Sequence, residues 1–171
     1  MKDNAQGEKL HTWVKESIKS NVTFKLLWKG STDGFGEATF HTKCDKQGPT
    51  LTVIKSQHDR VFGGFTSVPW TGSREYKKDT TAFIYSLTHG GKYAQQRNDD
   101  SICDSSSCGP IFGRASGYND IWIQDNCNTH TSNFCVANQT YQLPAGADNS
   151  FLAGSQWYSV KEIEVYAVKT I

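Results

Sequence analysis

The residue pattern predicts a mainly β fold, either a β-sandwich with a little helix or an α+β arrangement. One segment with helical spacing of apolar residues opens the chain, and about seven or eight short strand-like segments follow it. Turn-forming residues recur roughly every 8–15 positions, as they do in antiparallel sheets. The length of 171 residues suits a single domain. We therefore expect one domain over residues 1–171.

A helix is predicted over residues 8–20, and residues 1–7 before it are predicted to form a frayed end. The apolar residues of this segment lie three or four positions apart, which places them on one helical face. These residues are Leu10, Trp13, Val14 and Ile18. The charged side chains fall largely off this stripe, so the helix should pack one face against the rest of the domain.

The strand-like segments are recognised by alternating or β-branched residues between turn signals. They cover residues 24–29, 50–56, 60–66, 82–88, 109–114, 120–124 and 160–168. Residues 38–44 fit either a short helix or another strand, and a further short strand is expected around 140–141. The polar stretch 89–108, with its serine triplet, predicts an exposed loop.

The sharpest local prediction is a β-hairpin. Residues 50–56 are the richest in β-branched residues, and the tight turn at 58–59 lets residues 60–66 return antiparallel. The glycine pair Gly63 and Gly64 lies inside the second strand of this hairpin. Glycine within a strand indicates either a bulge or a close approach of another part of the chain.

Charge and hydropathy limit the classes of partner. The 18 Lys and Arg and the 17 Asp and Glu residues give a net charge of +1, without the basic excess of nucleic-acid-binding domains. No window approaches the roughly 18 consecutive apolar residues of a membrane span. The polar opening MKDNAQGEKL lacks the apolar core of a signal peptide. We therefore expect a cytoplasmic protein with no nucleic-acid partner and no membrane insertion.

Five cysteines raise the question of redox chemistry: Cys44, Cys103, Cys108, Cys127 and Cys135. An odd count without a secretion signal favours reduced thiols. Cys103 and Cys108 lie in the predicted exposed loop, where they could close a reversible disulfide. Acidic neighbours in this loop should raise the pKa of these thiols, which disfavours thiol catalysis.

Other catalytic and metal-binding patterns are incomplete. The spacings Cys127-x2-His130-x4-Cys135 and His41-x2-Cys44 offer suitable ligand types but not two close pairs with zinc-site spacing. The chain has no Gly-x-Ser-x-Gly elbow, EF-hand loop or complete phosphate-binding loop. A hydrolytic pair of carboxylates stays open, because their separation cannot be read from a sequence. We predict no catalytic residue, no metal and no cofactor.

Five runs in chain order resemble a TLDc domain. They are LLWKGSTDGFGEATFHTKC (26–44), GPTLTVIKSQHDRVFGGFTSVPW (48–70), DTTAFIYSL (79–87), GPIFGRASGYNDIWIQDNCN (109–128) and FLAGSQWYSVKEIEVYAV (151–168). The run at 48–70 is the most specific of them. The resemblance implies two antiparallel sheets packed as a β-sandwich and flanked by short helices, with the domain core at about 10–168.

The resemblance also implies a function. TLDc proteins are associated with oxidation resistance and with binding to the vacuolar proton-pumping ATPase (V-ATPase), whose assembly or activity they influence. No accepted catalytic mechanism belongs to the domain. We therefore expect a non-enzymatic protein-interaction domain, with V-ATPase subunits or another large assembly as its partner.

The resemblance directs the search for partner-binding residues to the glycine-marked turns. They are Asp33, Gly34 and Phe35 in the first turn, Gly63 and Gly64 after Phe62, and Gly113 after Phe112. We expect these glycines to shape the surface rather than to take part in chemistry. In a simpler interpretation, replacing Gly63 or Gly64 only unfolds a strand. A folded Gly→Ala variant that no longer binds would support the functional role.

Two other functions stay open. A small, neutral TLDc-like domain could be a permanent structural subunit of a large cytoskeletal or organellar assembly, and would then co-elute with it at high mass. The oxidation link also allows a thiol-based antioxidant enzyme, which requires peroxide-dependent turnover and a cysteine of low pKa.

Overall fold

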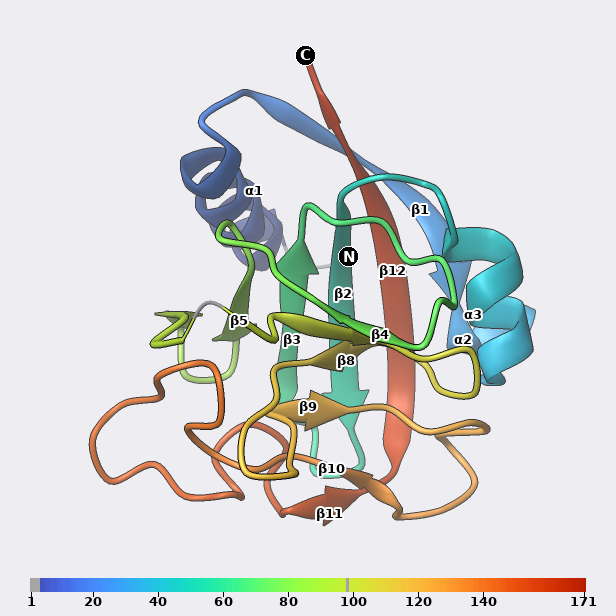
Figure 1. The fold of residues 1–171 in the computed structure, drawn as a ribbon, viewed down its shortest axis with the longest axis vertical. Helices are drawn as coiled ribbons and strands as arrows, with labels where there is room; N and C mark the ends of the chain where they lie inside the picture. Colours follow the sequence, from blue (N-terminus) through green and yellow to red (C-terminus); the bar gives the residue numbers. More distant parts are fainter. Residues whose placement is uncertain (1–3, 98) are drawn as a thin grey trace.

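The computed structural model describes residues 4–97 and 99–171, which form a mainly β fold with short helices (Figure 1). Two antiparallel six-stranded sheets make up this fold, so the predicted fold class is confirmed. The helices are α1 (Asn4–Ile18), α2 (Gly30–Asp33) and α3 (Glu37–Cys44). The strands are β1 (Val22–Lys29), β2 (Thr50–Ser56), β3 (Val61–Thr66), β4 (Glu75–Lys77), β5 (Phe83–Ser86), β6 (Gly91–Ala94), β7 (Ile102–Asp104), β8 (Ile111–Phe112), β9 (Ile121–Trp122), β10 (Asn133–Phe134), β11 (Trp157–Tyr158) and β12 (Val160–Thr170).

The first sheet has the strand order β1-β12-β2-β3-β5-β6. The hairpin predicted at 50–56 and 60–66 is confirmed, because β2 and β3 pair antiparallel from Thr50 with Thr66 to Lys55 with Val61. The closing strand expected at 160–168 is also confirmed as β12. It lies between β1 and β2, so the first and last strands of the chain are neighbours.

The second sheet has the order β11-β10-β9-β8-β7-β4 and consists of strands two or three residues long. The exposed loop predicted over 89–108 is wrong, since this stretch contains β6 and β7. Some of its polar residues are paired inside the protein. The buried carboxylate of Asp104 lies 2.6 Å from the Lys77 ammonium, and the buried Ser101 hydroxyl donates to the Gln95 side-chain oxygen at 2.7 Å. Internal pairing of this kind lets a polar segment form a buried strand.

A second departure lies after β9. The short strand expected around 140–141 is only an isolated bridge between Tyr141 and Gln95. The strand β10 has no period-two pattern in the sequence. It is held by the buried amide of Asn133, which donates to the carbonyl oxygens of Cys127 at 2.8 Å and Tyr158 at 2.9 Å. A side-chain amide thus takes the place of a longer hydrogen-bonded ladder.

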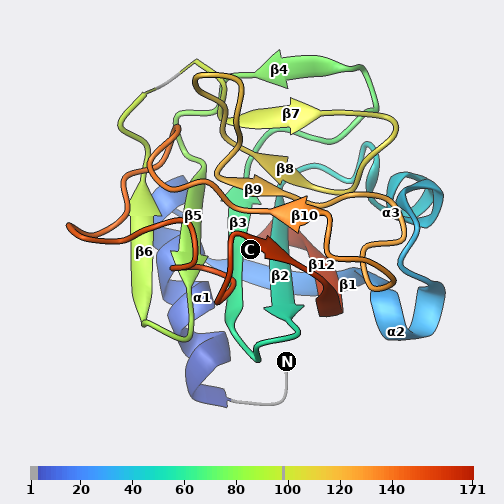
Figure 2. The ribbon, with the colours of Figure 1, turned by 90° about the horizontal axis from the view of Figure 1, so that it is seen from below.

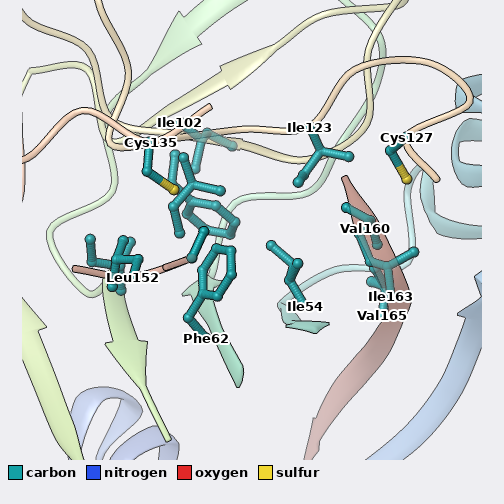
Figure 3. Packing of buried hydrophobic residues seen from close by; sticks show 14 of the residues in the cluster. Ile54, Phe62, Ile102, Ile123, Cys127, Cys135, Leu152, Val160, Ile163 and Val165 are labelled. Carbon is teal, nitrogen blue, oxygen red and sulfur yellow. The ribbon is translucent and has the colours of Figure 1, made fainter. Parts of the chain in front are cut away.

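The helix α1, the first sheet and the second sheet form three successive layers (Figure 2). The larger core lies between the two sheets and includes Ile54, Phe62 and Ile163 (Figure 3). The second core lies between the first sheet and α1, where Leu10 and Val14 of the predicted stripe are fully buried. The outward face of the first sheet is therefore covered by a helix.

The predicted frayed end is partly wrong, because α1 begins at Asn4; residues 1–3 lie outside the described residues. The open choice at 38–44 resolves as a helix, α3, which stands with α2 beside β1 (Figure 1). The α3 residue Phe40 is fully buried between Trp28 and Trp70, with ring centroids 5.4 and 5.6 Å away. This aromatic contact fixes the helix to the edge of the sandwich.

The glycine pair of β3 marks a close approach and not a bulge, because its pairing with β2 runs without a register shift. The hydroxyl of Tyr85 crosses Gly63 to donate to the Thr52 carbonyl oxygen at 2.7 Å. A Cβ at Gly63 would lie under 3.0 Å from both oxygens. On the opposite face, a Cβ at Gly64 would lie 2.6 Å from the ring of Phe112. The two glycines therefore let side chains pack directly on the backbone.

Candidate protein-interaction surface

Of the three glycine-marked turns predicted to bind a partner, the turn at Asp33, Gly34 and Phe35 reaches the surface. Asp33 ends α2, and its carboxylate accepts hydrogen bonds from Lys43 Nζ and from the backbone N–H of Lys29, each at 2.8 Å. These bonds, led by the one from Lys43, lower the pKa of Asp33. Gly34 is exposed with φ +98, a conformation that few other residues adopt. The turn is an ordered polar corner.

The rest of this turn joins it to the second sheet. The half-buried Phe35 packs its ring on Gly30, and its carbonyl oxygen accepts the Cys127 thiol at 3.7 Å. The backbone N–H of Glu37 donates to the Asp125 carboxylate at 3.0 Å. A hydrogen bond with the Asp125 side chain is the main cause that raises the pKa of Glu37. Because Cys127 and Asp125 follow β9, the corner adjoins one end of the second sheet.

The other predicted glycines, Gly63, Gly64 and Gly113, are buried. Gly113 has φ +72, and a Cβ there would overlap the carboxylate of Asp120. Burial raises the pKa of Asp120 to about 7, although the backbone N–H groups of residues 139–141 donate to its oxygens. These glycines let aromatic and carboxylate groups pack beneath the surface. Their role in partner binding stays a prediction.

On the second sheet, the structure shows a further surface that the predictions from the sequence do not include. One residue from each of its six strands pairs with the next in an unbroken cross-strand row. The row consists of Trp157, Phe134, Trp122, Ile111, Cys103 and Tyr76. Residues paired in register lie on the same face of a sheet. We call these six residues the aromatic face.

The aromatic face points away from the core. The strand neighbours Ile102, Phe112 and Ile121 belong to the cluster between the two sheets. Because successive side chains of a strand point to opposite faces, the row lies on the outer face. The first sheet has α1 on its outer face, whereas this face carries no helix among the described residues (Figure 2).

Several large side chains of this surface are exposed to solvent. Tyr76 and Trp157, at the two ends of the row, are 42% and 52% exposed. The rings of Trp122, Phe134 and Trp157 pack in sequence at tilted angles, with centroids 4.9 and 5.2 Å apart. Exposed aromatic residues gathered on one face are typical of interaction sites.

A groove of about 450 Å³ crosses the aromatic face. Ile111 and Cys103 contribute to its lining from β8 and β7, and Trp122 and Tyr76 flank them from the neighbouring strands β9 and β4. Arg74 also lines the groove, together with Ser105, Ser107 and Asn119. The volume lies within the range of roughly 300–1,000 Å³ that is usual for ligand pockets.

The cysteines are placed differently from the sequence prediction. All five are free thiols, with Cys103 half-buried in β7 and Cys108 buried, where its sulfur accepts the Trp122 indole N–H at 3.3 Å. The pKa of Cys103 is raised as expected, but burial is the main cause and the charge of Asp104 a smaller one. Within residues 4–97 and 99–171, no three His, Cys, Asp or Glu side chains gather as a potential metal site.

A model of the TLDc domain family matches residues 2–169. The chain belongs to this family. The resemblance carried by the five runs is thereby confirmed. No helix in the described part of this TLDc chain is long and apolar enough to cross a membrane.

Known proteins similar to this TLDc chain are considerably longer. MTOR-associated protein MEAK7 of Xenopus laevis is 26% identical over 129 residues, which cover 71% of this chain and 27% of that protein. Interferon-induced protein 44 of Homo sapiens is 41% identical over 58 residues, which cover 32% of this chain and 13% of that protein. The chain thus spans about a quarter or less of the length of these relatives.

Proposed function

We propose that this TLDc domain is a non-enzymatic interaction module of the cytoplasm that binds the V-ATPase through its aromatic face and regulates the pump. The choice of the V-ATPase as partner rests on what the TLDc resemblance implies. The aromatic face is the observation that supports a role in protein interaction. An interface of about 800 Å² on each partner would suffice for stable association. Such binding shifts the assembly equilibrium of the partner toward the state that it prefers.

The residue types of the aromatic face support this role. Trp and Tyr dominate the binding energy of protein interfaces, because they bury a large area at little cost in side-chain entropy. Trp157 and Tyr76 expose about half of their surface. The ring of Trp157 packs beside the nearly buried ring of Phe134, with centroids 5.2 Å apart, and the guanidinium of Arg114 lies 4.1 Å from the ring centroid of Tyr76. The packed residues hold the exposed rings in place, which lowers the ordering cost of binding.

The similarity to a relative named for its association with mTOR supports a second candidate partner, an assembly that contains mTOR. The aromatic face is equally available to such a partner. The same capture experiment separates the two candidates, because it identifies the proteins that the face retains.

The proposed test is affinity capture of the tagged chain from its native cells, followed by quantitative mass spectrometry. The native chain and the Trp157→Ser and Leu26→Ser variants are compared. Leu26 is a matched control, because it is 46% exposed on β1 of the other sheet. Loss of a Trp anchor is expected to reduce recovery of pump subunits at least tenfold. The Leu26→Ser variant should recover them within about twofold of the native chain.

Recovery of mTOR-containing assemblies without pump subunits would contradict the V-ATPase as partner and favour the mTOR-containing assembly. Equal recovery by all three chains would contradict the role of the aromatic face. Gel filtration of fresh lysate addresses the structural-subunit alternative, since a regulator should also occur in the free pool. Complete absence of the chain from the free pool would favour a permanent structural subunit.

We propose that oxidation resistance, where this domain supports it, acts through binding and not through a thiol. Burial raises the pKa of Cys103, which lowers the fraction of reactive thiolate. A Cys103→Ser variant is therefore expected to keep any protective effect within about twofold, as measured by survival of cells under peroxide. Loss of protection with capture unchanged would instead favour the antioxidant-enzyme alternative.

A further inference from the structure

The groove on the aromatic face combines an apolar lining with a positively charged border. Its apolar part is formed by Ile111, Tyr76 and Trp122. Arg74 lines the groove, and its Nε donates to the Ser106 hydroxyl at 2.9 Å. The guanidinium of Arg114 lies over the ring of Tyr76, 4.1 Å from the ring centroid. Both arginines thus stand at defined positions beside an apolar surface.

The arginines are not neutralised by neighbouring acids. In residues 4–97 and 99–171, neither Arg74 nor Arg114 forms a salt bridge, and the groove lining includes no carboxylate. The carboxylate of Asp104 belongs to the opposite face of β7 and is paired with Lys77. Burial is the largest cause of the raised pKa of Tyr76, and the charge of Asp100 ranks last, behind the opposing charge of Arg114. The border of the groove is therefore locally positive in a chain of net charge +1.

We propose that this groove binds an extended acidic segment of a partner protein with one aromatic or aliphatic anchor. The anchor packs between the rings of Tyr76 and Trp122, above the nearly buried Ile111, and acidic side chains on either side of it face Arg74 and Arg114. Planar guanidinium groups pair with carboxylates through two parallel hydrogen bonds, which fixes the orientation of the segment. The inference rests on the proposed function, because it names the kind of segment that the bound partner presents to the aromatic face.

Charge complementarity decides this choice of occupant. A basic segment would meet two arginines without a compensating carboxylate in the groove, and like charges at close range are repulsive. A purely apolar segment would leave both guanidinium groups without a partner of opposite charge once water is displaced. An acidic segment without an anchor would not cover the exposed rings. A segment with both acidic side chains and an anchor matches the two arginines as well as the exposed rings.

The test is a peptide titration of the purified full chain, monitored through the NMR chemical shifts of backbone and Trp indole N–H groups. The probe is the acetylated, amidated peptide Glu-Asp-Phe-Glu-Asp, compared with Lys-Lys-Phe-Lys-Lys and Glu-Asp-Ala-Glu-Asp. We expect the acidic Phe peptide to shift signals of β4, β7, β8 and β9 and to bind at least tenfold more tightly than either comparison peptide. Raising the salt from about 50 to about 300 mM should weaken its binding severalfold.

Matched charge variants complete the test. Replacing Arg74 and Arg114 by Gln should weaken binding of the acidic peptide at least fivefold. Replacing Lys15 and Lys25 by Gln removes the same charge from exposed positions of α1 and β1, and should change binding less than twofold. An equal effect of both double variants would contradict the groove, and equal binding of the acidic and basic peptides would contradict the charge argument. Tighter binding of an oligothymidylate would overturn the assignment to a protein segment.

The outcomes separate this inference from the proposed function, since the titration contains no pump. Successful capture of the pump with no binding of the acidic Phe peptide to the groove would overturn only the acidic-segment inference. Binding of the peptide with no recovery of the pump would overturn only the choice of the pump as partner.

Discussion

Replacing Gly63 by alanine is expected to destabilise the folded domain by about 4 kcal/mol. The new Cβ would lie well under 3.0 Å from the carbonyl oxygen of Thr52 and within 2.8 Å of the Tyr85 hydroxyl. The Thr52 oxygen is backbone in the neighbouring strand, so the contact cannot be relieved by a rotamer change. Urea unfolding followed by tryptophan fluorescence measures the loss of free energy.

A matched control for Gly63→Ala is Gly36→Ala. Gly36 has φ −81, and its Cβ would lie 3.5 Å from the nearest atom, a carboxylate oxygen of Asp125. Its free energy of unfolding should stay within about 0.5 kcal/mol of the native value. A Gly63→Ala domain as stable as the Gly36→Ala domain would contradict the close approach. A folded Gly63→Ala domain that lost partner binding would support the predicted binding role of this glycine.

Replacing Asp104 by asparagine is expected to cost about 3 kcal/mol of stability at neutral pH. Its carboxylate has no exposed surface and accepts hydrogen bonds from Lys77 Nζ and from the backbone N–H groups of Thr71 and Gly72. Asparagine removes the charge partner of Lys77. It also places an amide N–H₂ group among hydrogen-bond donors that all need an acceptor. The segment 70–77, which leads into β4 of the aromatic face, should loosen.

The loss caused by Asp104→Asn should depend on pH. Burial favours the neutral acid, but the hydrogen bonds from Lys77, Thr71 and Gly72 lower the pKa of Asp104 from 3.8 to about 2. Because the folded-state pKa is lowered, the stabilisation is complete above the ordinary value and disappears as the pH falls through about 2. The difference between native and variant unfolding free energies should therefore shrink from pH 5 toward pH 2. A difference that stays constant across this range would contradict the account, and Asp99→Asn serves as an exposed control.

The sequence predicts the elements whose pattern is local. The hairpin of β2 and β3 follows from β-branched residues on both sides of a tight turn, and α1 follows from the spacing of Leu10 and Val14. The segment that contains β7 does not follow the same rules. Its buried Asp104 resembles a loop residue until its partner Lys77 is brought beside it by the fold. Long-range polar pairing is invisible in a local pattern.

The candidate site shows the same division. The glycine-marked turns are visible in the sequence, and the one at Asp33 does lie at the surface. The aromatic face is not visible, because its row joins strands of two or three residues whose register is set only by the fold. One local signal does exist: Trp122 lies between Ile121 and Ile123, and both of these neighbours are fully buried. Period-two alternation there indicates an outward-facing tryptophan.

The measurement that tests the central claim most directly is hydroxyl-radical footprinting of the captured complex, read out by mass spectrometry. It compares side-chain oxidation rates in the free and the bound chain. The account predicts that oxidation of Tyr76 and Trp157, 42% and 52% exposed in the free chain, falls at least about threefold on binding, while that of Leu26 is unchanged. Protection of Leu26 with unchanged rates at Tyr76 and Trp157 would contradict the assignment of the aromatic face as the partner-binding surface.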